Sequence, residues 1–144
     1  MNSSKKTLTI LSTLLLTFVI ASSVFAMKAE YNYMNAASLQ KAVENKADIA
    51  IVDIQVSEEF KNHHIKGAIE TCAYPVKSVA DRAKFDATLK QLKNSAQPIV
   101  VICPRGKGGA ERTVNYFTEQ GIAPYRIFIL TEGQAAWPYS VEKK

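Results

Sequence analysis

Cysteine and histidine are scarce in this sequence, which has two of each among 144 residues. The histidines, His63 and His64, are adjacent, and neighbouring side chains point in different directions rather than at one ion. We therefore expect neither a metal site nor a bound cofactor. A Cys-x-x-Cys thiol oxidoreductase is also disfavoured, because Gly106 stands where a second cysteine after Cys103 would be. A disulfide within the chain could join only Cys72 to Cys103.

Concentrated positive charge is missing as well. The first 26 residues hold two of the 18 basic residues and none of the 13 acidic ones, so the remainder has 16 basic against 13 acidic residues, a net charge of +3. The basic residues form no stripe interleaved with aromatics, so we expect no nucleic-acid partner. The sequence contains no repeat, linker or low-complexity tract, which favours one globular domain.

The longest apolar run lies near the start of the chain and predicts a secretory signal peptide over residues 1–26. Leu8–Ala21 is uncharged, two lysines precede it, and Val-Phe-Ala at 24–26 suits a signal peptidase. The alternative is a retained membrane anchor, but the run is shorter than the ~20 residues that a span needs. We expect a periplasmic or otherwise exported protein of residues 27–144 without a stable membrane anchor. No cysteine follows the cleavage point, so a lipoprotein is not predicted.

From residue 35 onward, apolar runs that predict strands alternate with helical patterns. Such alternation favours parallel strands joined by helical crossovers. The sequence therefore predicts a three-layer, doubly wound α/β domain with a central, mostly parallel sheet and a core over about residues 35–140. The expected strands cover residues 48–54, 68–71, 99–102 and 125–130, and the expected helices cover residues 35–44, 57–60, 78–93 with a break near 84, and 110–120.

Several single residues near the ends of these elements have predicted structural roles. Ser57 supplies a capping oxygen for the short second helix. Asp53 ends a strand and is expected to tie it to nearby backbone, and His64 is expected to be a turn residue. Trp137 and Tyr139 are expected to be aromatics that close the core.

The stretch from Pro98 to Thr113 carries the strongest chemical signal. A run of β-branched residues ends at Cys103, six residues with three glycines and two cations follow, and a helical pattern comes next. Cys103 would therefore lie at the carboxyl end of a parallel strand and beside a helix N-terminus, a usual place for a ligand site. The helix dipole, inward amides, Arg105 and Lys107 favour negative charge on sulfur, which predicts a reactive thiolate. The alternative is a small apolar residue that only ends a buried strand.

Three separated blocks of sequence, in this order, resemble those of the rhodanese family. They are IVDI-x-x-SEEF-x-x-x-HIKGAIE at 51–70, VVICPRGKGGA at 100–110 and LTEGQAAW at 130–137. The resemblance extends from about Asn35 to Trp137 and is to the single-domain sulfurtransferase type. With its signal peptide, the chain also resembles the small periplasmic phage-shock type of sulfurtransferase.

Three positions depart from the family pattern, and none of them is the cysteine. Gln55 stands where the family usually has arginine, so an ion pair of the usual kind with Asp53 is not expected. Glu132 replaces the first of two glycines before the final helix. Gly109 replaces a common serine, which removes a hydroxyl donor and is expected to loosen the loop.

The resemblance implies sulfane-sulfur transfer of the thiosulfate sulfurtransferase kind. Cys103 would attack the outer sulfur of a small anionic donor such as thiosulfate and become a persulfide. It would then pass the sulfur to cyanide, to a thiol or to a protein acceptor. Loop amides aimed at the anion agree with this chemistry. The residues expected to bind the substrate are Pro104, Arg105, Gly106, Lys107, Gly108 and Gly109.

Two other functions compete for the same cysteine. A cysteine phosphatase also cradles an anion in a loop after a strand, but it needs an arginine six residues after the cysteine to grip phosphate. This chain has Gly109 there, and its loop is one residue too short. The second alternative stays open: Cys103 could serve a non-enzymatic persulfide carrier or a redox-sensing binding module for a protein partner.

We predict that Cys72 and Cys103 form no structural disulfide in the working protein, despite the expected export. A locked Cys103 could not accept sulfur, and a thiol with thiolate character is a good leaving group that makes such a bridge easy to reduce. Thiol counting on protein purified from its native compartment without reductant checks this prediction. A bridge that survives mild reductant while full sulfurtransferase activity is retained would contradict it, together with the assignment of Cys103 as sulfur carrier.

Overall fold

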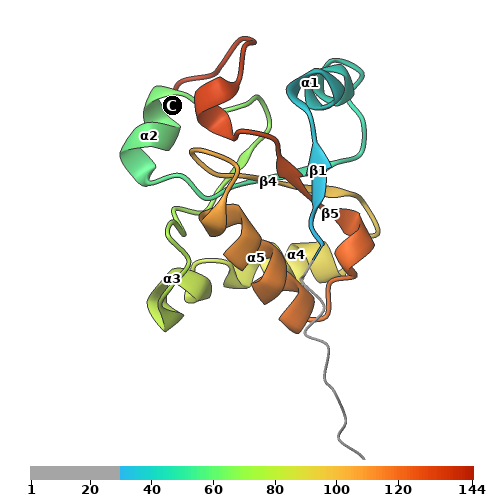
Figure 1. Ribbon diagram of the computed structural model, residues 1–144, viewed down its shortest axis with the longest axis vertical. Coiled ribbons are helices and arrows are strands. Elements are labelled where there is room, and N and C mark those ends of the chain that lie inside the picture. The colour runs from blue at the N-terminus through green and yellow to red at the C-terminus, as the bar shows by residue number, and fades with distance from the viewer. Residues whose placement is uncertain (1–29) are drawn as a thin grey trace, which may run out of the picture.

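The computed structural model describes residues 30–144 and contains a five-stranded sheet in the order β1-β5-β4-β2-β3, with each neighbouring pair parallel (Figure 1). The predicted signal peptide, residues 1–26, lies outside the described residues. The strands are β1 (Asn32–Met34), β2 (Ala50–Asp53), β3 (Ile69–Glu70), β4 (Ile99–Ile102) and β5 (Ile127–Leu130). The helices are α1 (Ala36–Glu44), α2 (Ser57–Asn62), α3 (Val79–Ala83), α4 (Asp86–Lys93) and α5 (Gly108–Glu119), with 3-10 helices η1 (Pro124–Arg126) and η2 (Gln134–Ala136).

Helices cover both faces of the sheet, which confirms the predicted three-layer α/β arrangement. In Figure 1, α1 and α2 lie on one side of the sheet and α3, α4 and α5 lie on the other. Alternate residues of β2 pack on opposite faces of the sheet. Val52 lies in the same core cluster as Leu89 and Phe117. Ile51 lies in the other core cluster, which contains Leu39. Because both faces are covered, the central strands are apolar at successive positions, and they are therefore recognisable as continuous runs.

The local sequence explains where the first helices begin. The Asn35 side chain accepts the backbone N–H three residues further on at 2.8 Å, which confirms the predicted start of α1. A capping box opens α3 at Ser78. The expected break within residues 78–93 is confirmed at Phe85, which is fully buried and packs edge-on against Phe117. This ring lies off the helical stripe, so its burial separates α3 from α4.

The structure differs from the sequence prediction at several elements. The sequence does not predict β1, because its three residues are mostly exposed and carry little hydrophobic pattern. Ser57 does not cap α2: it lies in the first turn, and its hydroxyl donates to Glu70 at 3.3 Å. Helix α5 begins at Gly108, two residues earlier than expected. The last strand is shorter than expected, because Pro124 starts a 3-10 turn that takes its first residues.

The segment after η2 packs over α2 and corrects two structural expectations. The backbone of His64 pairs with that of Glu142, and its ring stacks on Phe60 with centroids 4.0 Å apart. His64 is therefore a packed junction between segments rather than a simple turn residue. Trp137 is buried, but Tyr139 is 39% exposed, so only the first of these aromatics closes the core.

The carboxyl end of β2 carries a buried carboxylate. Gln55 donates its backbone N–H to Asp53 Oδ1 at 2.8 Å and its side-chain amide to Oδ2 at 3.0 Å. These bonds confirm that Asp53 ties the strand end to nearby backbone, with an amide in place of an ion pair. Desolvation raises the pKa of Asp53 to about 6, because the hydrogen bonds from Gln55 offset only part of the cost of burying the charge.

We predict that the Asp53 carboxyl makes the protein less stable as pH rises. Its pKa is higher in the folded than in the unfolded chain, so folding takes up a proton between about pH 4 and pH 6 and stability falls through that window. Asp53→Asn cannot ionise at this position. From pH 4 to pH 7 the free energy of unfolding of the wild type should therefore fall by roughly 2 kcal/mol more than that of Asp53→Asn. Urea unfolding at both pH values measures this. The exposed Asp48→Asn is the matched control, and an equal pH dependence of wild type and Asp53→Asn would refute the prediction.

Candidate active site

Cys103 directly follows β4 at the carboxyl edge of the sheet and is 2% exposed. The neighbouring strand ends at the same level, since Asp53 is in register with Ile102. The Cys103 sulfur accepts the backbone N–H of Gly106 at 3.0 Å. Helix α5 begins at Gly108, which lines the same pocket as the sulfur. The fold thus brings an amide donor and a helix N-terminus to Cys103, the features that stabilise a thiolate.

The course of residues 103–109, here called the sulfur loop, depends on close backbone contact between Gly106 and Gly133. Gly106 has a φ of +63°, and a Cβ there would lie 2.5 Å from the Leu130 carbonyl oxygen and 2.7 Å from the Glu132 nitrogen. Gly133 has a φ of +68°, and a Cβ there would collide with backbone atoms of Cys103 and Gly106. Any side chain at either position would push the sulfur loop away from the chain that follows β5.

Backbone hydrogen bonds complete this junction. Gln134 donates its N–H to the Cys103 carbonyl at 2.9 Å, and Ala135 donates to the Pro104 carbonyl at 3.0 Å. Glu132, which replaces a glycine of the family pattern, adopts a φ of +60°. This left-handed conformation costs a non-glycine residue roughly 1–2 kcal/mol. The substitution therefore retains the left-handed conformation that glycine favours, at a local cost in strain.

A pocket of about 210 Å³ opens over the sulfur loop and combines cationic side chains with main chain. The residues that line it are Tyr74, Cys103, Pro104, Arg105, Lys107, Gly108, Gly109 and Arg112. Every site residue that the sequence predicts lines this pocket except Gly106, which packs on the chain after β5 and contributes its N–H to the sulfur. Arg105 and Lys107 are exposed, as expected of cations at the rim of an anion site.

Two of the lining residues, Tyr74 and Arg112, are not predicted from the sequence. A Cβ on Gly109 would lie 3.0 Å from the Tyr74 ring, so this ring fills the space beside the glycine. Arg112 follows Gly108 by four residues, and this helical spacing could have placed it beside the loop. Tyr74 comes from a distant segment, and no local pattern indicates it.

The second cysteine, Cys72, hydrogen-bonds to a carboxylate and is not among the residues that line the pocket. The Cys72 thiol donates to Glu70 at 3.4 Å, and burial together with this carboxylate raises the pKa of Cys72. Lys144 pairs with Glu70, and its hydrogen bond lowers the pKa of that carboxyl. Cys72 and Cys103 are both free thiols. Its raised pKa makes Cys72 a poor nucleophile at neutral pH, and Cys103, which lines the pocket, is the candidate for covalent chemistry.

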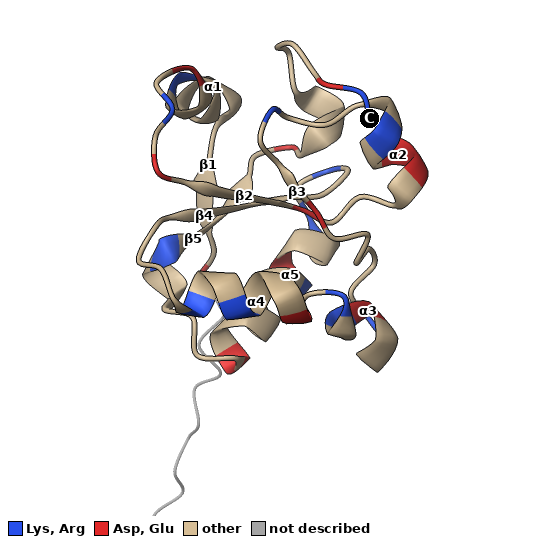
Figure 2. Cartoon of the chain, turned by 180° about the vertical axis from the view of Figure 1, so that it is seen from behind, with Lys and Arg blue, Asp and Glu red and all other residues tan. Residues whose placement is uncertain are grey.

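Charge over the remaining described surface is mixed. Figure 2 shows Lys and Arg interspersed with Asp and Glu along several helices. Among residues 30–144, no group of three or more His, Cys, Asp or Glu side chains is placed to hold a metal ion. No helix within this range has the length and apolar character that crossing a membrane requires. Within residues 30–144, the sulfur loop is therefore the candidate site of chemistry.

The chain is similar to a bacterial protein of known sequence. It is 29% identical over 93 residues to the uncharacterized protein YibN of Escherichia coli strain K12, a match that covers 65% of this chain and 58% of YibN. The chain thus spans less than two thirds of the length of this relative.

Solved structures share the fold at low sequence identity. A rhodanese-related protein from Thermoplasma volcanium is 20% identical with a TM-score of 0.58, and the match covers 79% of this chain and 100% of that one. A thiosulfate sulfurtransferase from Pseudomonas aeruginosa is 18% identical with a TM-score of 0.58, and the match covers 81% of this chain and 20% of that one. At these identities the similarity concerns the fold.

The family comparison agrees with the resemblance seen in the sequence and with the three-layer fold. Residues 35–138 match the family Rhodanese, described as the rhodanese-like domain. The match includes the whole sulfur loop, η2 and the junction between them. Since it extends over most of the chain, this protein belongs to the rhodanese-like domain family.

Proposed function

We propose that the protein is a sulfurtransferase that carries a sulfane sulfur as a persulfide on Cys103. The rhodanese-like domain family comprises sulfurtransferases and related enzymes. The observation that carries the proposal is the setting of the Cys103 sulfur, which accepts the Gly106 N–H at 3.0 Å in a pocket lined by cationic side chains. Such a setting suits a thiolate that attacks an anionic donor.

The proposed reaction has two half-reactions that balance without an external oxidant or reductant. The Cys103 thiolate forms a bond to the outer sulfur of thiosulfate, the sulfur–sulfur bond of thiosulfate breaks, and sulfite leaves with its electron pair. An acceptor such as cyanide then attacks the outer sulfur of the persulfide, thiocyanate forms, and the thiolate is restored. Helix α5 and the Gly106 amide favour the anionic sulfur before and after each transfer.

Burial of the sulfur supports a compact donor. Cys103 is 2% exposed, and the pocket above it measures about 210 Å³. A donor must therefore enter the pocket to reach the sulfur. A small dianion such as thiosulfate matches the size of the pocket and the charges of Arg105 and Lys107 better than a bulky, singly charged organic donor.

We also propose that the protein is exported, as a single-domain sulfurtransferase of the periplasmic phage-shock type. This proposal rests on the signal pattern of residues 1–26 and on the family resemblance. The competing role is a persulfide carrier or redox-sensing module for a protein partner, which would use the same thiol. The two roles differ in turnover, because an enzyme reacts repeatedly with small donors and acceptors, whereas a carrier holds one sulfur for its partner.

We predict that incubation with thiosulfate adds one sulfur atom to the protein at Cys103. The Gly106 amide and the start of α5 stabilise the charge of the resulting persulfide. Intact mass spectrometry before and after incubation measures the addition, and thiocyanate release on addition of cyanide measures turnover. Cys103→Ser should lose both, and Cys72→Ser, the matched control, should retain both.

The Cys103 assignment is wrong if the Cys103→Ser protein still gains the sulfur or if Cys72→Ser loses it. A wild type that loads one sulfur but releases no thiocyanate favours the carrier role over the enzyme. The same intact mass, taken on protein isolated from cells that express the full sequence, tests whether residues 1–26 have been removed.

We predict that the exposed loop cations steer the donor into the pocket. Replacing Arg105 and Lys107 together by alanine should raise the KM for thiosulfate roughly three- to tenfold, because two positive charges near the entrance are lost. It should also weaken the salt dependence of kcat/KM, since the steering field is screened within ~10 Å at moderate ionic strength. Steady-state kinetics at two salt concentrations test this. Unchanged kinetics in the double variant would show that the backbone amides suffice.

A further inference from the structure

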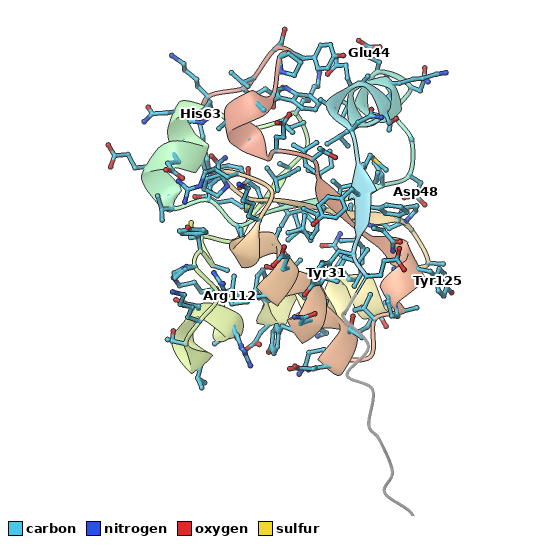
Figure 3. All side chains as sticks on the ribbon, in the orientation of Figure 1. Tyr31, Glu44, Asp48, His63, Arg112 and Tyr125 are labelled. Carbon is cyan, nitrogen blue, oxygen red and sulfur yellow. The ribbon has the colours of Figure 1, made fainter. Side chains whose placement is uncertain are left out.

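Arg112 is a cation of the pocket whose position is set by the fold. Its Nε donates to the Pro75 carbonyl at 2.9 Å, and its side chain is half-buried. Figure 3 labels Arg112 on the flank of α5 that faces the segment around α3. Arg105 and Lys107, by contrast, are exposed side chains of the sulfur loop. Recognition of a ligand needs a charge held in place, whereas steering does not.

The Arg112 guanidinium occupies the space that a side chain at position 108 would need. A Cβ built on Gly108 would lie 3.0 Å from Nη1 and 3.9 Å from Nη2. The glycine therefore allows the guanidinium to lie against the sulfur loop, beside the pocket that Cys103 also lines. Since Nε is engaged by Pro75, the N–H groups of Nη1 and Nη2 are the donors that face the loop.

This pair of donors matches one end of a thiosulfate ion. The outer sulfur of the donor must meet Cys103, so its oxygen atoms occupy another part of the same pocket. A planar guanidinium donates two nearly parallel hydrogen bonds to two oxygens of one group, which the single ammonium of lysine does not reproduce. A sulfur chain without oxygen atoms has no pair of oxygens to accept this fork of two hydrogen bonds from the guanidinium.

We propose that Arg112 binds the oxygen-bearing end of the sulfur donor and makes the site selective for donors with a sulfonate-type group over oxygen-free sulfur chains. This inference rests on the proposed sulfur transfer and assigns its donor class. When the sulfur–sulfur bond of thiosulfate breaks, negative charge grows on the departing sulfite. The bonds from Arg112 strengthen as this charge develops, so they raise kcat as well as affinity.

The experiment compares two donors of similar negative charge, thiosulfate and inorganic polysulfide. Arg112→Lys retains the charge and loses the fork, and its kcat/KM for thiosulfate should fall roughly tenfold, while that for polysulfide should stay within about threefold of the wild type. Arg112→Met should lose more activity with thiosulfate than Arg112→Lys does. Lys90→Met, which removes an exposed charge from α4, is the control and should leave both donors unaffected.

Gly108→Ala changes the same contact from the side of the sulfur loop and retains the positive charge of Arg112. The added methyl group presses on Nη1 and shifts the guanidinium. Alanine also favours the start of α5, so the variant should unfold at an unchanged or higher temperature. We expect its KM for thiosulfate to rise roughly threefold or more, and by a larger factor than its KM for polysulfide, a difference between donors that a general weakening of the fold would not produce.

A binding measurement separates this inference from the proposed function. Calorimetry with thiosulfate and the inert Cys103→Ser protein should give a dissociation constant that rises roughly tenfold when Arg112→Lys is added. That loss of binding supports the role of Arg112 even if the wild type shows no turnover, an outcome that defeats only the sulfurtransferase proposal. Equal binding with and without Arg112, or an equal loss of activity with thiosulfate and polysulfide in Arg112→Lys, would overturn the assignment of Arg112.

Discussion

The close contact between Gly106 and Gly133 is the constraint on which the site depends. It joins the loop after β4 to the chain after β5 at a separation that leaves no room for a Cβ on either residue. Two backbone hydrogen bonds from η2 to the Cys103 and Pro104 carbonyls hold the same junction. With its carbonyls engaged there, the sulfur loop directs the Gly106 N–H to the sulfur. The position of the nucleophile is thus set by main chain, so the cations around it can differ without moving it.

The polar groups at the carboxyl edge of the sheet each have their own hydrogen-bond partners. The two carboxylates at the ends of β2 and β3 have their own donors, Gln55 for Asp53 and Lys144 for Glu70. Glu70 also accepts a hydrogen bond from Cys72, whose pKa it helps to raise. Cys103 instead faces an amide, a helix start and a pocket lined by cations. Two cysteines of one small domain therefore have different polar neighbours, a carboxylate beside Cys72 and a backbone N–H donor beside Cys103.

The sequence predicts the parts of this structure whose signals are local. Strand β4 and the loop after it are recognisable, because a parallel strand covered on both faces is a continuous apolar run and a tight loop needs glycine. The short β1 is missed, because an exposed edge strand carries no such pattern. Ser57 resembles a helix cap by composition, yet its hydroxyl bonds to Glu70 across thirteen positions of sequence. Composition near a helix start does not indicate which partner a hydroxyl will choose.

The amino-acid sequence alone determined the order of strands and helices from residue 35 onward, the cysteine at the end of a buried strand, and the glycines that only a tight loop tolerates. Tertiary structure decided what surrounds the sulfur: the Tyr74 ring beside Gly109, the Arg112 guanidinium against Gly108, and the left-handed backbone of Glu132 that meets the loop. The physical reason is the range of the interactions. Hydrophobic periodicity and backbone freedom act between neighbours in the chain, whereas a pocket is lined by segments that only the packing of the sheet and its helices brings together.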